Sequence, residues 1–137
     1  MAHVHAGVVM ARILVVDDEE GIRTLIRNML VREGHQVTTA CDGVEALRVV
    51  DSQAVDLVIT DLIMPEMEGV EMISELRRRF PAIKIIAMSG GGMGGAVDYL
   101  RLAKALGAGQ TLAKPFTREV LLKMVEAAFP PTLSNEP

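Results

Sequence analysis

Five residues whose types suit metal or phosphoryl chemistry stand at the ends of hydrophobic runs in the chain. They are Asp17, Asp18, Asp61, Ser89 and Lys114. Three carboxylates that lie close together repel one another and stay ionised only when a cation compensates their charge. Oxygen ligands without a cysteine or histidine cluster favour a hard ion, and a few carboxylates completed by water suit Mg²⁺. If these side chains converge, the sequence therefore predicts a magnesium site with a lysine beside it.

The chemistry that such a site supports is phosphoryl transfer to a carboxylate. A bound cation and the ammonium of Lys114 would neutralise the equatorial oxygens of a phosphoryl group in transfer. A carboxylate with an oxygen left over could then attack phosphorus and form an acyl phosphate. The hydroxyl of Ser89 could donate a hydrogen bond to a phosphoryl oxygen. The five residues together predict an aspartate phosphorylation site.

Apolar runs that alternate with helix-period segments must position these side chains. The predicted strands are 13–16, 36–40, 56–60, 83–88 and 111–113, and the predicted helices are 22–30, 44–50, 65–80, 97–106 and 120–128. Five strand–helix units predict an α/β fold, a flavodoxin-like (βα)5 three-layer sandwich with a parallel five-stranded sheet in the order 2-1-3-4-5. In that order strands one, three, four and five are neighbours. The five side chains should therefore meet at one edge of the sheet, where ligands bind in such folds.

Composition limits the class of protein. The chain has 137 residues, 50% of them hydrophobic, and a formal net charge of −4. This length suits one domain, the apolar content excludes disorder, and the acidic balance argues against binding nucleic acid through its phosphates. The single cysteine, Cys41, fits a reducing compartment. No uninterrupted apolar run approaches the roughly 18 residues of a membrane span, and the N-terminus is no convincing secretion signal. We therefore expect a cytoplasmic protein that binds no membrane.

Four sequence features at their joint spacing resemble the receiver domain of bacterial two-component response regulators, of the single-domain, chemotaxis-regulator-like kind. They are VVDDEE, VITDLIMPEMEG, the strand-end serine and LAKPF, and the similarity covers roughly residues 11–129. The resemblance implies that Asp61 is the phosphoacceptor and that Lys114 contacts the phosphoryl group. It also implies that Ser89 is a switch hydroxyl and that the Lys114–Pro115 peptide bond is cis, a geometry that only bonds before proline adopt cheaply.

The same resemblance implies the metal ligands. Asp18 would hold Mg²⁺ directly and Asp17 through water, together with Asp61 and the backbone carbonyl of Ile63. The chain departs from the family at Thr111, three residues before the lysine, where an aromatic switch residue is common.

The implied organisation is a flexible N-terminal extension (1–10), a receiver domain (11–129) and a C-terminal tail (130–137). The implied function is Mg²⁺-dependent phosphoryl transfer from the phosphohistidine of a sensor histidine kinase, or of a histidine phosphotransfer protein, to Asp61. The transfer would switch a surface that binds an unknown downstream protein, with no direct binding of nucleic acid. Such a domain is no enzyme in the ordinary sense, because it catalyses only its own phosphorylation and dephosphorylation.

Several alternatives remain open. The chain could be a phosphorelay intermediate or the receiver fragment of a longer regulator. From other classes, it could be a small-molecule-binding flavodoxin-like module or a hydrolase of phosphoesters. Asp17 and Asp18 could also simply cap the helix that follows them. The glycine-rich segment 90–95 fits neither a dinucleotide fingerprint nor a P-loop, and we expect a mobile loop that orders or shifts on phosphorylation.

Overall fold

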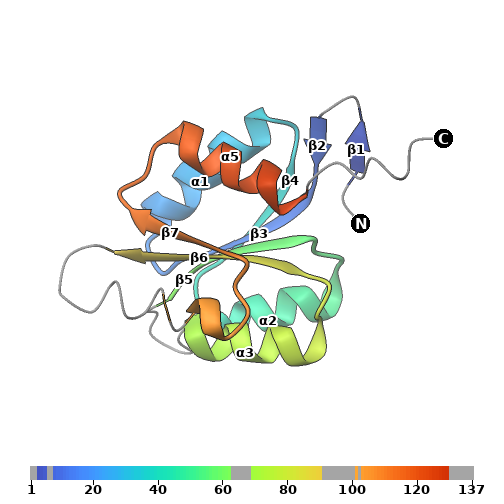
Figure 1. Cartoon of the computed structure of the whole chain (residues 1–137), viewed down its shortest axis with the longest axis vertical. Helices are drawn as coiled ribbons and strands as arrows, with labels where there is room; N and C mark the ends of the chain where they lie inside the picture. The colour runs from blue at the N-terminus through green and yellow to red at the C-terminus, as the bar shows by residue number, and fades with distance from the viewer. Residues whose placement is uncertain (1–2, 6–7, 63–68, 91–100, 102, 130–137) are drawn as a thin grey trace.

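A five-stranded parallel sheet forms the centre of the molecule. The computed structural model describes residues 3–5, 8–62, 69–90, 101 and 103–129. The strands of the sheet are β3 (Arg12–Val16), β4 (Gln36–Ala40), β5 (Leu57–Asp61), β6 (Lys84–Gly90) and β7 (Gln110–Lys114). They pair in parallel in the order β4-β3-β5-β6-β7 (Figure 1). This is the order 2-1-3-4-5 of the predicted fold, which is confirmed.

Helices cover both faces of the sheet. They are α1 (Glu20–Arg32), α2 (Gly43–Ser52), α3 (Gly69–Arg79) and α5 (Arg118–Ala128). Figure 1 shows α1 and α5 on one face and α2 and α3 on the other, so the three predicted layers are present. Arg101 and residues 103–105 are also helical. Several predicted features lie outside the described residues. They are the rest of the predicted fourth helix before Ala103, the start of the predicted third helix at 65–68, residues 91–95 and the tail 130–137.

Side chains on the two faces of each central strand pack into two separate hydrophobic cores. In β3, Ile13 and Val15 pack in the cluster that includes Ile26 of α1 and Leu121 of α5. Leu14 and Val16 point to the other side and join the cluster beneath α2 and α3. All five residues of β5 are buried, as expected of a strand covered on both faces. The sheet is therefore held rigidly from both sides, which fixes the positions of its strand ends.

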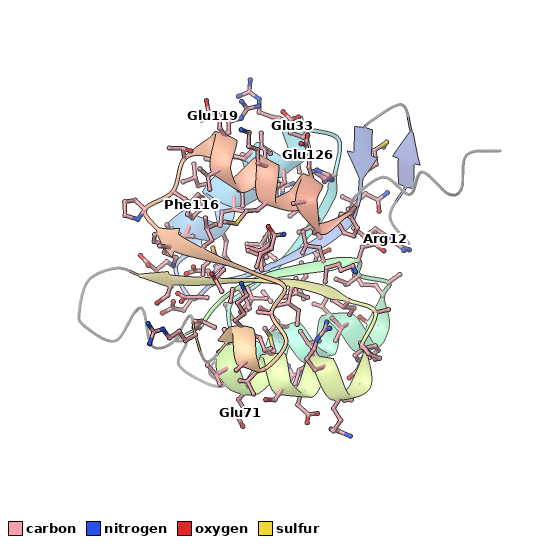
Figure 2. The ribbon with its side chains drawn as sticks, in the orientation of Figure 1. Arg12, Glu33, Glu71, Phe116, Glu119 and Glu126 are labelled. Atoms are coloured by element: carbon pink, nitrogen blue, oxygen red, sulfur yellow. The ribbon has the colours of Figure 1, made fainter. Side chains whose placement is uncertain are left out.

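The outer faces of the helices carry charged side chains, together with a few exposed apolar ones such as Leu25, Val31 and Val120. Glu71 on α3 and Glu119 and Glu126 on α5 are exposed and point away from the sheet (Figure 2). In the described part of the chain, none of the helices has the length and apolar character that a membrane crossing requires.

An antiparallel pair of short strands precedes the sheet. β1 (His3–His5) and β2 (Val8–Met10) pair with Val4 opposite Val9. Each of these strands is only three residues long, too short to be predicted from a hydrophobic pattern. The division of the chain at residues 10 and 129 stays a prediction.

His35, which lies just beyond the end of α1, binds the backbone of Ala11, the residue before β3. Its Nδ1 accepts a hydrogen bond from the backbone N–H of Ala11 at 3.0 Å. Both residues are buried. Burial disfavours the charged imidazole and lowers the pKa of His35 below its usual value, although the negative charge of Glu33 acts in the opposite direction. The hydrogen bond requires an unprotonated Nδ1, so neutral His35 is the form that stabilises the fold.

The stability of the chain should therefore fall in acid through His35. Because the folded-state pKa is depressed, this contribution is present above the unfolded-state value of 6.5 and is lost as the pH falls through the folded-state pKa. Urea unfolding between pH 8 and pH 5.5 measures this slope. His35→Leu leaves the Ala11 N–H without its acceptor, so it should lower the unfolding free energy by about 1–3 kcal/mol at pH 8. It should also flatten the slope, and an unchanged slope would contradict the assignment.

Candidate functional site

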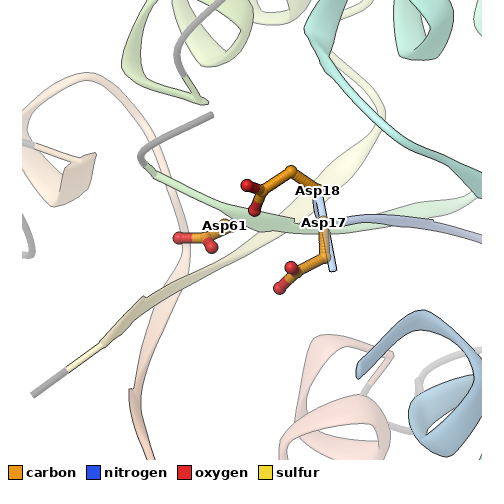
Figure 3. Close-up of side chains that lie close together, drawn as sticks. All are labelled: Asp17, Asp18 and Asp61. Carbon is orange, nitrogen blue, oxygen red and sulfur yellow. The ribbon is translucent and has the colours of Figure 1, made fainter. Parts of the chain in front are cut away.

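The carboxyl ends of β3, β5 and β7 bring four of the predicted site residues together. Asp61 is the last residue of β5, Lys114 is the last residue of β7, and Asp17 and Asp18 directly follow β3. β3 pairs with β5, so the aspartates lie on adjacent strand ends (Figure 3). Carboxylate oxygens of Asp17, Asp18 and Asp61 all lie within 4.8 Å of one another. The predicted convergence at this edge is therefore present for the three acids.

Lys114 contacts the cluster from β7, the edge strand of the sheet. Its Nζ donates to Oδ2 of Asp17 at 2.8 Å and to Oδ2 of Asp61 at 3.1 Å. β6 and β5 lie between β7 and β3 in the sheet, so the lysine side chain reaches across two strand ends to make the first contact. The long, flexible stem of lysine permits this reach. One cation thus links two carboxylates that belong to different strands.

The ammonium of Lys114 is strongly held in its charged form. Partial burial on its own would lower the pKa of this group. The hydrogen bonds and negative charges of Asp17 and Asp61 outweigh that effect, so the pKa of Lys114 is raised above its usual value. Lys114 is therefore a fixed positive charge at any physiological pH, available to the oxygens of an anionic ligand.

Asp17 is the most constrained residue of the cluster. It is fully buried, and its Oδ1 accepts a hydrogen bond from the backbone N–H of Glu19 at 2.9 Å. The residue at the N-cap position of α1 is Glu19, which makes no side-chain cap. The alternative that Asp17 or Asp18 caps this helix is therefore wrong, and both carboxylates are directed to the cluster.

Asp18 differs from its neighbour in being exposed, and in the described part of the chain no hydrogen bond or ion pair engages its carboxylate. The cluster carries three negative charges against the single ammonium of Lys114. A divalent cation that prefers oxygen ligands fits this donor set, because it would remove the remaining imbalance. The residues that could hold it are Asp17, Asp18 and Asp61.

Ser89 lies beside this cluster without joining its hydrogen bonds. It is buried on β6, one residue beyond Met88, which pairs with Asp61. Its hydroxyl donates to the carbonyl of Gly90 at 3.4 Å, and in the described part of the chain it bonds to none of the four charged residues.

The other predicted features of the site have different outcomes. Ile63, the predicted carbonyl ligand, lies outside the described residues. Thr111 is half-buried on β7 and pairs with Ala87. The Lys114–Pro115 peptide bond is cis, as expected.

Two residues support the site although their types and positions predict no role for them. Gly69 begins α3 so close to β5 that an added Cβ would stand 2.0 Å from the carbonyl oxygen of Asp61. Arg23 donates from Nη1 to the carbonyl of Asp17 at 2.8 Å. The contact of Gly69 leaves no sequence signal beyond the glycine itself. Arg23 does leave one, since a cation so near the start of a helix opposes the helix dipole.

Comparison with known proteins agrees with this geometry. The family model of the response regulator receiver domain matches residues 13–126. Sporulation initiation phosphotransferase F of Bacillus subtilis is 34% identical over 87% of this chain and 94% of its own. The alkaline phosphatase synthesis transcriptional regulatory protein PhoP of the same organism is 37% identical, but the chain spans only 51% of its length.

A solved structure shares the architecture. The response regulator protein TrrA from Thermotoga maritima, in complex with Mg(2+)-BeF, superposes with a TM-score of 0.76 at 36% identity, and the match covers 87% of this chain and 99% of that one. The family match spans most of the chain, and the strand order and the cluster at the strand ends agree with it. The chain therefore belongs to the response regulator receiver domain family of two-component signalling proteins.

Proposed function

We propose that the chain accepts a phosphoryl group on the carboxylate of Asp61 from the phosphohistidine of a sensor histidine kinase or histidine phosphotransfer protein. The observation that carries this proposal is the ammonium of Lys114, held against both Asp17 and Asp61 beside the exposed Asp18. The carboxylate proposed to attack, the ammonium proposed to assist it and the acids proposed to hold the metal all come from one edge of the sheet. The acidic balance of the chain argues against direct nucleic-acid binding, so we propose that the output is contact with a downstream protein.

The transfer is a displacement at phosphorus. A carboxylate oxygen of Asp61 attacks, the bond between phosphorus and the donor's imidazole nitrogen breaks, and the electron pair leaves with that nitrogen. The ammonium of Lys114, 3.1 Å from Oδ2 of Asp61, moves onto a phosphoryl oxygen and neutralises its charge. The hydroxyl of Ser89 lies one residue beyond the partner of Asp61 on the neighbouring strand, and turns from the Gly90 carbonyl to donate to another phosphoryl oxygen.

Asp17, Asp18 and Asp61 are the residues that would hold Mg²⁺, with the backbone carbonyl of Ile63. Their oxygen-only donor set, within 4.8 Å, fits this ion. When bound, Mg²⁺ would supply positive charge that reduces the repulsion between the carboxylates and the oxygens of the phosphoryl group. The structure of the relative TrrA in complex with Mg(2+)-BeF supports Mg²⁺ as the ion of this site.

The side chains proposed to stabilise the transfer and to hold the metal all belong to this chain, so the donor need only deliver the phosphoryl group. A small phosphodonor should therefore serve in place of a kinase. The test is intact-mass measurement after incubation with acetyl phosphate and Mg²⁺. The expected result is a gain of one phosphoryl group, absent when the metal is chelated. The absence of an adduct, together with no Mg²⁺-dependent binding of beryllofluoride, would overturn the proposal.

A role as phosphorelay intermediate is the second candidate. It is favoured by the similarity to a protein named as a phosphotransferase, of which the chain covers 94%. In that case the phosphorylated chain would pass its phosphoryl group to the histidine of a phosphotransfer protein. Loss of the adduct with matching gain of phosphohistidine would distinguish this role from signalling by contact alone. Either exchange is expected in the cytoplasm, where reducing conditions keep the exposed Cys41 a thiol.

A further inference from the structure

Asp17 and Asp18 are consecutive in the chain, yet both direct a carboxylate oxygen toward the same cluster. Successive side chains of an extended strand point to opposite faces. Asp17 is fully buried and Asp18 is exposed, yet oxygens of both lie in the same cluster. The backbone between them must therefore leave the geometry of the strand and be held in that form. The contacts that hold it decide how well the pair can bind a cation.

Each polar group of Asp17 is engaged by a donor or acceptor. Its backbone N–H donates to Ala40, its Oδ1 accepts from Glu19, and its Oδ2 accepts from Lys114. Its carbonyl oxygen accepts from Nη1 of Arg23 at 2.8 Å. That carbonyl belongs to the peptide group that joins Asp17 to Asp18. Arg23 therefore holds the peptide plane that joins the two aspartates and on which the direction of Asp18 depends.

The position of Arg23 near the start of α1 is electrostatically unfavourable for the helix. The residue lies in the fourth position of α1, whose helix begins at Glu20, and its backbone N–H donates to Glu19. A positive charge so near a helix N-terminus opposes the helix dipole. The acidic cluster and the Asp17 carbonyl supply the compensating attraction. Arg27, one turn further along α1, has only a weak contact with Asn28 at 3.4 Å and provides a natural comparison.

We propose that Arg23 is a positioning residue for the divalent-cation site, which it serves by fixing the peptide plane between Asp17 and Asp18. The inference rests on the proposed function, because it assigns Arg23 to the cation site of that function. Arg23 contacts neither the cation nor the phosphoryl group; its effect passes through the Asp17 carbonyl. It therefore sets the affinity of the unphosphorylated chain for Mg²⁺.

The test is calorimetric titration of Mg²⁺ into the unphosphorylated chain. Arg23→Met keeps an unbranched apolar stem but removes the donors and the charge of the side chain, and is expected to weaken binding by about tenfold or more, as outer residues of metal sites commonly do. Arg23→Lys retains one donor and the charge and should restore most of the affinity. Arg27→Met, with the same loss of charge on the same helix, should bind within about twofold of the wild type, since exposed charges are largely screened.

The outcomes separate positioning from electrostatics and from misfolding. A weakening that persists at high ionic strength supports positioning, whereas one that disappears there, or that Arg27→Met shares, overturns it. Unchanged binding by Arg23→Met also overturns it. If circular dichroism shows that Arg23→Met is unfolded, Arg23→Gln replaces it, with the same expected loss because its stem is too short to reach the carbonyl. If the wild type itself binds no Mg²⁺, the proposed function fails and not only the role of Arg23.

Discussion

Asn in place of Asp61 is expected to leave the chain with no phosphoryl adduct after incubation with acetyl phosphate and Mg²⁺. The amide lacks the anionic oxygen that attacks phosphorus, and neither neighbouring carboxylate can substitute for it. Asp17 is buried and held by Glu19 and Lys114, and Asp18 follows a different strand. Intact-mass measurement under acid quench detects the adduct directly. The loss should be complete rather than partial.

Two controls make this result specific to the site. Asp51→Asn makes the same chemical change on the exposed surface of α2 and should leave the adduct intact. The unfolding free energy of Asp61→Asn should equal or exceed that of the wild type without metal, because the change removes one of three mutually repelling charges. An adduct on Asp61→Asn at the wild-type level would show that another residue is the phosphoacceptor.

Ala in place of Gly69 is expected to damage both the fold and the site. Its Cβ would lie 2.0 Å from the carbonyl oxygen of Asp61 and 2.7 Å from Cα of Leu62, and both are backbone atoms that cannot swing aside. The backbone N–H of Gly69 also donates to Leu62 at 2.9 Å, so the start of α3 is tied to the end of β5. Relieving the overlap requires separation of the two elements. We expect a loss of about 3 kcal/mol in unfolding free energy, measured by urea denaturation, and slower phosphorylation of the molecules that remain folded.

Gly21→Ala is the matched control for this change. An added Cβ at Gly21 meets nothing within 4 Å, and the residue lies in α1. Alanine is the better helix former, so this variant should be more stable by about 0.5 kcal/mol. If both variants lost stability equally, the effect at Gly69 could not be assigned to its contact with β5.

Most of the sheet could be predicted from the sequence because the hydrophobic pattern itself carries the information. The continuous apolar run 13–16 predicts a central strand covered on both faces, and the burial of all four residues confirms this. The third strand, β5, begins at Leu57, one residue later than the predicted start at Asp56. That carboxylate instead pairs with Arg12 through two side-chain hydrogen bonds and accepts from its backbone N–H. A charge bound to a residue 44 positions away gives no local pattern.

The charged cluster was predictable because strand ends are recognisable and parallel strands share one edge. The individual hydrogen bonds of the cluster could not be predicted from the sequence. Whether Ser89 bonds to the cluster depends on a one-residue offset against Met88 and Asp61, which periodicity does not resolve. Arg23 was missed because its contact is with a backbone carbonyl, and every residue offers one. Its unfavourable place at the start of α1 was the only sequence sign of its role.

The contact between Lys114 and Asp17 also bears on when the chain becomes competent during its synthesis. It joins residues 97 positions apart, and β7 must pair with β6 before the lysine can reach. Until then the acids of β3 and β5 face one another without their cation. Such long-range contacts form late because the intervening chain must first be ordered. A nascent or truncated chain that lacks β7 would therefore have the carboxylate of Asp61 but not the ammonium of Lys114. Under the proposed function, acceptance of a phosphoryl group would then require that β7 has joined the sheet.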